Sequence, residues 1–145
     1  MPDGLPEAFD PAEDCPWCSP REILARGGLL ATLADQDAGQ RGLFVDFFGR
    51  PASTHKAVAL LALEYGVPLL VLGIRKLRGE LRHELHIADV IRPEEYQGRP
   101  DAVKAITQRY TTALEQIVRA APEQYFWLHR RWKHQPAPKK AKRAA

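Results

Sequence analysis

One stretch near the C-terminus constrains the fold more than any other, because its apolar side chains recur every three or four residues. They are Ala102, Val103, Ile106, Tyr110, Ala113, Leu114, Ile117, Val118 and Ala121. This spacing places them on one face of an α-helix, the face that packs on another element. Asp101 stands at the expected start, where a negative charge suits the helix dipole. The pattern therefore predicts a long amphipathic helix over residues 101–121, lying on a sheet.

Two short apolar runs in the first half of the chain predict strands of that sheet. Residues 29–34 and 69–74 are each bounded by turn residues, which is typical of buried strands. Between them, the apolar segment 54–65 indicates a helix that Ser53 or Thr54 can cap. A strand, a helix and a second strand in this order predict a right-handed parallel βαβ unit with 54–65 as its crossover.

The remaining extended segments complete an α/β fold with a partial sheet. Residues 81–90 alternate apolar and polar side chains, so we expect a half-exposed antiparallel strand at the sheet edge. Residues 43–48 form another extended stretch. A chain of 145 residues is long enough for one domain with a real core, which we place at residues 20–135.

The two ends of the chain differ sharply in charge, although the formal net charge is only +3. Residues 1–19 hold five acids, four prolines and no Lys or Arg, so we expect an irregular segment. Residues 136–145 have the composition of a disordered basic tail. With Arg130, Arg131 and Lys133, this end suits an anionic membrane or a partner. A solvated tail that keeps the protein soluble explains the same charges.

The two cysteines form a C-P-W-C pair at residues 15–18 in a Pro-rich, acidic stretch. A redox pair normally opens a helix after a strand, and a four-cysteine zinc site needs a second pair, which this sequence lacks. We therefore expect no metal site and no cofactor.

No membrane-spanning segment or signal peptide is expected in the sequence. The longest apolar tract, residues 57–74, is interrupted by Glu64, Gly66 and Pro68. It is typical of a helix followed by a strand, and any membrane contact should be peripheral.

Ligands of open α/β sheets gather at the carboxyl ends of parallel strands. That rule points to Asp35, Gln36 and Asp37 after the first predicted strand, and to the segment 73–75 after the second. A carboxylate there could orient a base, hold an arginine or bind a metal. From position alone, loop acids that cap or turn the chain are the simpler interpretation. Two acids without a nearby histidine make a poor metal site.

Three blocks of sequence carry a family resemblance. They read L-L-A-T-L-A-D-Q-D-A-G at 29–39, F-F-G-R-P-A-S-T at 47–54 and P-E-Q-Y-F-W-L-H-R-R-W-K at 122–133. In this order they resemble the bacterial lipid A biosynthesis acyltransferases of the lysophospholipid acyltransferase superfamily. The resemblance covers roughly residues 21–135, and the last block, rich in Trp, Tyr and Arg, is its most specific part.

The resemblance implies transfer of an acyl group from an acyl carrier protein or coenzyme A thioester to a hydroxyl of a glycolipid or lysophospholipid. It places that work at the cytoplasmic face of the inner membrane. The first acid of the family's D-x-D loop matches Asp35, which becomes the best catalytic candidate, as a supporting acid. Gln36, Asp37, Ser53, Thr54 and Arg75 are the candidate substrate-binding residues.

The family's H-x-x-x-x-D/E motif, in which a carboxylate orients a basic histidine, is absent. The residues five places after the five histidines are Leu60, Ala88, Ile91, His134 and Lys139, and none is acidic. His83 and Asp89 share a strand face but lie about 20 Å apart along it. We therefore predict that no imidazole in this chain is held by a carboxylate. The catalytic His and Arg would then come from elsewhere.

On this interpretation the chain corresponds to the family's C-terminal portion, from a truncated or split reading frame, and is inactive alone. A companion chain or self-association could complete it. The alternative from another class is a non-catalytic protein that binds an anionic membrane surface or a partner chain. Nucleic acid is the weakest candidate partner, because the sequence holds no known nucleic-acid-binding motif.

Overall fold

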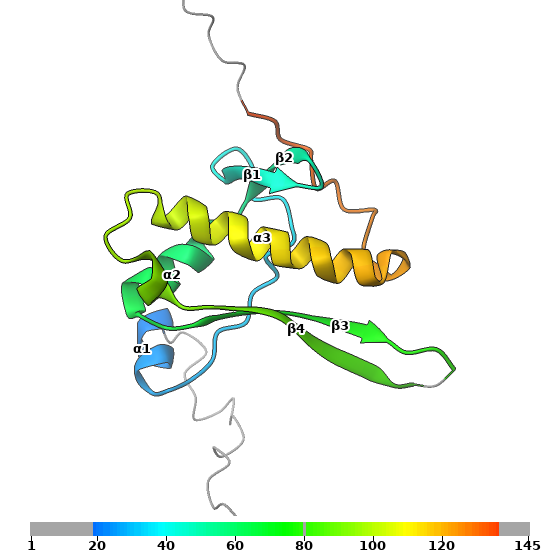
Figure 1. Ribbon diagram of the computed structural model, residues 1–145, viewed down its shortest axis with the longest axis horizontal. Helices are drawn as coiled ribbons and strands as arrows, with labels where there is room; N and C mark the ends of the chain where they lie inside the picture. The colour runs from blue at the N-terminus through cyan, green and yellow to red at the C-terminus, as the bar shows by residue number, and fades with distance from the viewer. Residues whose placement is uncertain (1–18, 80, 137–145) are drawn as a thin grey trace, which may run out of the picture. The chain divides into compact units, whose positions relative to one another are not determined.

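The computed structural model describes residues 19–79 and 81–136 (Figure 1). The chain divides into two compact units, Met1–Ala31 and Thr32–Ala145, and each is described by itself. This boundary falls inside the segment expected as one domain. The acidic segment 1–19 and the basic tail 136–145 lie outside the described residues, apart from their inner ends, Ser19 and Pro136.

The described part of the first unit is a short helix, α1 (Pro20–Ala25). Its start is a capping box, because the Ser19 hydroxyl accepts a hydrogen bond from the Glu22 N–H while the Glu22 carboxylate accepts one from the Ser19 N–H. Proline at the first helical position lacks the N–H that would have no partner there. Gly27 follows with φ of 75°, a left-handed conformation in which the chain leaves the helix.

The second unit is mixed α/β, as the sequence predicts. Its strands and helices, in chain order, are β1 (Leu43–Phe47), β2 (Arg50–Thr54), α2 (Ala57–Tyr65), β3 (Leu69–Lys76), β4 (His83–Ile91) and α3 (Ala102–Ala120). Two short 3-10 turns, η1 (Pro93–Tyr96) and η2 (Pro122–Gln124), flank α3. The strands form two antiparallel hairpins, β1–β2 and β3–β4.

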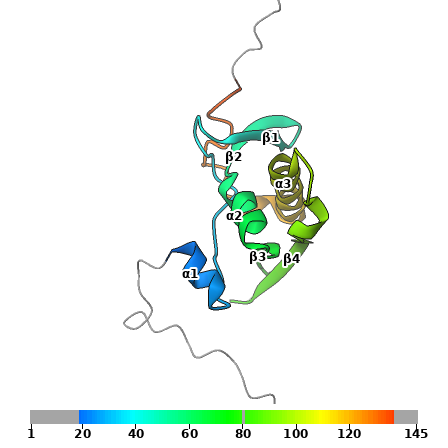
Figure 2. The same cartoon turned by 90° about the vertical axis from the view of Figure 1, so that its left-hand side faces the viewer.

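The predicted long helix is confirmed as α3, and it packs against both hairpins. Figure 2 views α3 nearly end-on, with β1 on one side of it and β3 and β4 on the other. Its buried face joins residues of α2, β3, β4 and η1 in one core, whose members are Ala59, Val71, Ile91, Tyr96, Ala102, Ile106, Tyr110 and Ala113. Tyr110 crosses this core to donate its hydroxyl hydrogen bond to the His55 carbonyl at 2.7 Å.

Gly73 of β3 allows α3 to approach the β3–β4 hairpin closely. A Cβ atom at this position would lie 2.5 Å from the Cγ2 atom of Ile117 on α3, well inside van der Waals contact. Only glycine therefore fits here without a shift of the helix or the strand.

The predicted strand at 29–34 is wrong. These residues form no strand, and Leu29 and Leu33 are 79% and 77% exposed. An apolar run becomes a strand only where a neighbouring strand can accept and donate its backbone hydrogen bonds. Here β1 pairs with β2 and β3 pairs with β4, and neither pair extends to this segment.

The predicted parallel βαβ unit is therefore also wrong, although its helix exists as α2. The strand before α2 is β2, which pairs with β1 through a two-residue turn at Phe48 and Gly49. Both turn residues have positive φ, 55° and 74°, as a type I′ hairpin turn requires. Ser53 and Thr54 belong to β2 and do not cap α2, whose N-cap position is Lys56.

The predictions for the other hairpin were better. β3 covers the strand expected at 69–74, and β4 is the antiparallel strand expected at 81–90. The two pair with each other from Leu69↔Ile91 to Lys76↔His83, with one register shift next to Val71.

Candidate functional site

The loop that follows the first sequence block is held by the C-terminal segment after α3. The backbone N–H of Asp37 donates to the Nε2 atom of His129 at 2.8 Å. The Tyr125 hydroxyl donates to the Asp35 carbonyl at 3.5 Å. Residues about 90 positions apart in the chain therefore lie in contact, and the loop takes a fixed place against the last sequence block.

His134 forms an ion pair with Asp37 that the sequence did not predict. The Nδ1 atom of His134 lies 2.6 Å from the Oδ1 atom of Asp37. The prediction that no imidazole is held by a carboxylate is therefore wrong. A search for an acid five residues after a histidine could not find this pair, because its members are 97 residues apart.

The Asp37 carboxylate is almost completely buried, with a side-chain exposure of 8%. Burial has the largest single effect on its pKa and raises it. Hydrogen bonds from His134 and the Gly39 N–H, together with the charge of His134, outweigh burial and hold the pKa below its ordinary value of 3.8. Asp37 is therefore a buried anion stabilised by its neighbours.

Arg131 is the largest fully buried side chain in the described residues, with an exposure of 1%. Its guanidinium donates to the Ser53 carbonyl at 2.5 Å and to the Thr54 hydroxyl at 2.7 Å, and it stacks 5.2 Å from the ring of Phe47. Burial lowers its pKa. The predicted role of Arg131 at an anionic surface is wrong, because its charge is enclosed by the protein.

The predicted substrate-binding residues Ser53 and Thr54 are also fully buried. The Ser53 hydroxyl donates to the Gly39 carbonyl, and the Thr54 hydroxyl donates to the Ala52 carbonyl while accepting from Arg131. Their hydroxyls are therefore used to hold the hairpin and the loop together, and neither side chain can reach a substrate in this conformation.

These contacts bring all three sequence blocks into one place. We call them the clasp: Tyr125, His129, Arg131 and His134, holding the loop 35–39 and strand β2. Aromatic packing supports it, since the rings of Phe47 and Trp132 lie 5.7 Å apart. Three of its buried polar atoms have no hydrogen-bond partner among the described residues, namely Asp37 Oδ2, Arg131 Nε and Trp132 Nε1.

The remaining candidates of the loop and the C-terminal segment lie at its surface. Asp35 is half-buried and Gln36 is exposed. Among the described contacts, no hydrogen bond or ion pair involves the Asp35 carboxylate, which leaves it available to a ligand. Arg130 and Lys133 are exposed on either side of the buried Arg131.

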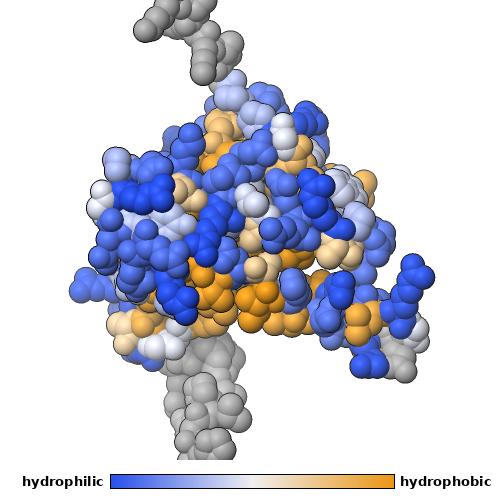
Figure 3. Space-filling view, viewed as in Figure 1, coloured by the Kyte–Doolittle hydropathy of each residue, from blue (hydrophilic) through white to orange (hydrophobic). Residues whose placement is uncertain are grey.

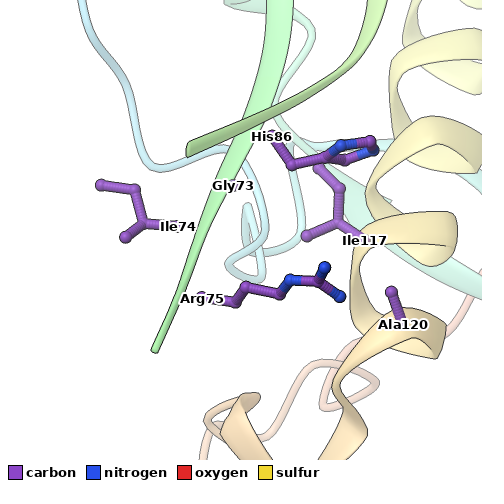
Figure 4. A pocket seen from close by; sticks show the side chains of 6 residues that line it. All are labelled: Gly73, Ile74, Arg75, His86, Ile117 and Ala120. Carbon is purple, nitrogen blue, oxygen red and sulfur yellow. The ribbon is translucent and has the colours of Figure 1, made fainter. Parts of the chain in front are cut away.

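Arg75 lies at a different place, on strand β3. It forms an ion pair with Glu84 of β4 at 2.5 Å, and both side chains are 43% exposed. Figure 4 shows the Arg75 and His86 side chains extending toward α3, with Ile117 between them. They line a cavity of about 90 Å³ together with Gly73 and Ala120. No described contact joins Arg75 to the clasp.

Asp89, which the sequence analysis weighed as a partner for His83, is paired with Arg109 instead. Two hydrogen bonds of 2.7 and 2.9 Å join the guanidinium of α3 to this carboxylate, and a third of 2.6 Å joins it to Glu95. The hydrogen bond from Arg109 is the main cause that lowers the pKa of Asp89. This network fixes α3 to β4.

Fold and clasp together define a mixed α/β protein whose conserved-looking segments meet around an acidic loop, and the comparison with protein families gives the class. The model of the bacterial lipid A biosynthesis acyltransferases matches residues 21–134, so the chain belongs to this family. No curated protein and no solved structure matches the chain.

Two further searches concern the described ranges 19–79 and 81–136. No helix in them is both long and apolar enough to cross a bilayer. Nor do they contain a group of three or more His, Cys, Asp or Glu side chains placed to hold a metal ion. The C-P-W-C pair at 15–18 lies outside the described residues.

Proposed function

We propose that this chain takes part in the transfer of a fatty acyl group from an acyl carrier protein or coenzyme A thioester to a hydroxyl of a glycolipid or lysophospholipid. In that reaction the hydroxyl loses its proton to a base and its oxygen attacks the thioester carbonyl. The C–S bond breaks, and the thiol leaves with a proton. The proposed place is the cytoplasmic face of the inner membrane.

The observation that carries this proposal is the clasp. Segments of sequence typical of the family, separated by up to about 90 residues, converge on the loop 35–39 and fix its backbone. Such pre-positioning is what a loop that orients a substrate or a catalytic group requires. Asp35 is the residue that we assign to this role, because its carboxylate has no other described contact.

We further propose that the chain alone lacks a working base. The nearest candidate is His134, because a histidine beside a carboxylate is the usual arrangement of a base and its orienter. Neither of the two described cavities borders this pair, however. Asp37 is also tied by its own N–H to His129 and by Oδ1 to the Gly39 N–H, as expected of a structural anchor. We assign the pair to holding the loop.

The test is acyl transfer measured with radiolabelled acyl donors and lipid acceptors. The chain alone should give no product. A companion chain of the family that carries the H-x-x-x-x-D/E motif should restore turnover, and Asp35→Asn should abolish the restored activity. Glu123→Gln, which changes an exposed acid outside the clasp, is the matched control and should leave it unchanged.

A second candidate arrangement makes His134 the base. It predicts product from the chain alone, lost in His134→Asn and retained in His83→Asn. That outcome would overturn the proposal that the chain is incomplete, while keeping acyl transfer itself.

The non-catalytic alternative remains a binding protein for an anionic membrane or a partner chain. The exposed Arg130 and Lys133 support it. Vesicle binding without turnover under any pairing of chains would favour it over acyl transfer.

A further inference from the structure

The β3–β4 hairpin has an apolar face that α3 does not cover. Side chains that alternate along β3 and their direct partners on β4 share this face. We call it the outer strip; its members are Leu70, Leu72 and Ile74 with their partners Val90, Ile87 and Leu85. Five of the six side chains are 44% to 64% exposed, and Val90 is half-buried.

The opposite face of the same hairpin shows what covered residues look like. Val71 and Ile91 are buried in the core beneath α3, and Gly73 lies against Ile117. The β3–β4 sheet is therefore apolar on both faces, and one of them faces outward. Exposed apolar surface of this continuity marks a site of protein or membrane contact.

Charge at one end of the outer strip indicates which contact. The next pair after Ile74 and Leu85 is Lys76 and His83. Beyond it, residues 76–83 carry Lys76, Arg78 and Arg82 against Glu80, three cations to one acid and a formal charge of +2. At this cationic tip Leu81 is 90% exposed.

Figure 3 shows this arrangement on the surface. Hydrophobic surface lies below α3, where Figure 1 places β3 and β4, and it gives way to hydrophilic surface around the hairpin tip. Aliphatic side chains that end in flexible cations match the layers of a bilayer, in which acyl chains lie beneath anionic phosphates.

We propose that the outer strip and the tip of the β3–β4 hairpin form a peripheral docking surface for an anionic phospholipid bilayer. The aliphatic side chains enter the boundary between head groups and acyl chains, and Lys76, Arg78 and Arg82 lie at the level of the phosphates. The inference rests on the proposed function only in that a lipid acceptor must be reached at a membrane. Binding can be measured without any acyl transfer.

The experiment is co-sedimentation of the full chain with vesicles of phosphatidylcholine containing 30% phosphatidylglycerol, taken as a test composition of about a third anionic lipid. Each surface cation contributes roughly fivefold in affinity, so Arg78→Gln/Arg82→Gln should weaken binding about 30-fold. Leu72→Asn/Ile87→Asn should weaken it by about tenfold or more. Binding should fade with salt and be lost on pure phosphatidylcholine.

Matched controls separate this surface from other contacts. Arg130→Gln/Lys133→Gln removes the same amount of charge from the C-terminal segment and should change binding by about threefold or less. Leu128→Asn alters an equally exposed leucine outside the hairpin and should have no effect. Circular dichroism and thermal melting show that each variant is folded.

Three results would overturn the inference. Wild-type chain might bind neutral vesicles equally well, or the C-terminal variant might lose binding while the hairpin variants keep it. The third is a concentration-dependent dimer that Leu72→Asn/Ile87→Asn disrupts, with no vesicle binding, which would assign the strip to a second copy of the chain. None of these results depends on whether the protein transfers acyl groups.

Discussion

The two hairpins of the second unit are finished in opposite ways. β1–β2 is closed by polar side chains from the far end of the chain, with Arg131 buried against β2 and Phe47 packed on Trp132. β3–β4 is covered by α3 on one face and leaves the other face apolar and exposed. The first region is specified by hydrogen bonds that tolerate little change. The second is specified by shape on one side and left for a contact on the other.

The largest effect should come from the clasp. Arg131→Ala leaves the Ser53 carbonyl and a cavity beside Phe47 where a guanidinium was buried, so we expect a loss of about 3 kcal/mol in the free energy of unfolding. Urea unfolding of this variant and of Arg130→Ala, the exposed neighbour, measures the difference. Equal stability of the two variants would mean that the buried guanidinium does not hold the hairpin.

The next effect tests the covered face of β3–β4. Gly73→Ala places a methyl group against Ile117, and we expect a loss of about 2 kcal/mol from overpacking. Ile117→Ala alone also destabilises, by loss of burial. The double variant should be more stable than the sum of the two losses predicts, because the second change makes room for the first. Strict additivity in thermal or urea unfolding would contradict close contact at this position.

How much of this contrast could be predicted from the sequence depends on the range of the interactions. The helix α3 and the strand β4 follow from periodicity within one segment, and both were predicted within a few residues. The strand expected at 29–34 was not found, because a short apolar run does not reveal whether a pairing partner exists. The β1–β2 turn was missed because the positive φ of Phe48 has no signal in its residue type.

The candidate site shows the same limit more strongly. The sequence placed Asp35 and Asp37 in one loop and identified the C-terminal block as characteristic. It could not show that Arg131 is buried while Arg130 and Lys133 are exposed, since three basic residues in a row of aromatics look alike in one dimension. The available signal was the aromatic company of Arg131, because Trp and Phe beside a cation favour stacking over solvent.

A smaller effect comes from the ion pair between His134 and Asp37, and its pH dependence has a definite sign. The pKa of Asp37 is lowered in the folded state, so its ionised form stabilises the fold above the ordinary value of 3.8, and this stabilisation is lost as the pH falls through the lower folded value. His134→Asn should therefore cost about 1 kcal/mol near neutral pH and less at the acidic end.

Unfolding in urea at several pH values measures this cost, with His83→Asn as the control because His83 is exposed on β4. A stability difference between wild type and His134→Asn that grows below the ordinary pKa would contradict the assigned direction.

The smallest effect should lie on the outer strip, one residue from a buried position. Leu72→Thr keeps a residue suited to strands and removes apolar surface that is largely in water already, so we expect a change of less than about 0.5 kcal/mol in the free energy of unfolding. Val71→Thr places a hydroxyl in the core beneath α3 and should cost about 1–2 kcal/mol. Urea unfolding of the two variants therefore compares the faces of one strand directly. If Leu72→Thr costs as much as Val71→Thr, the outer strip is covered in solution, and the opposition between the two hairpins fails.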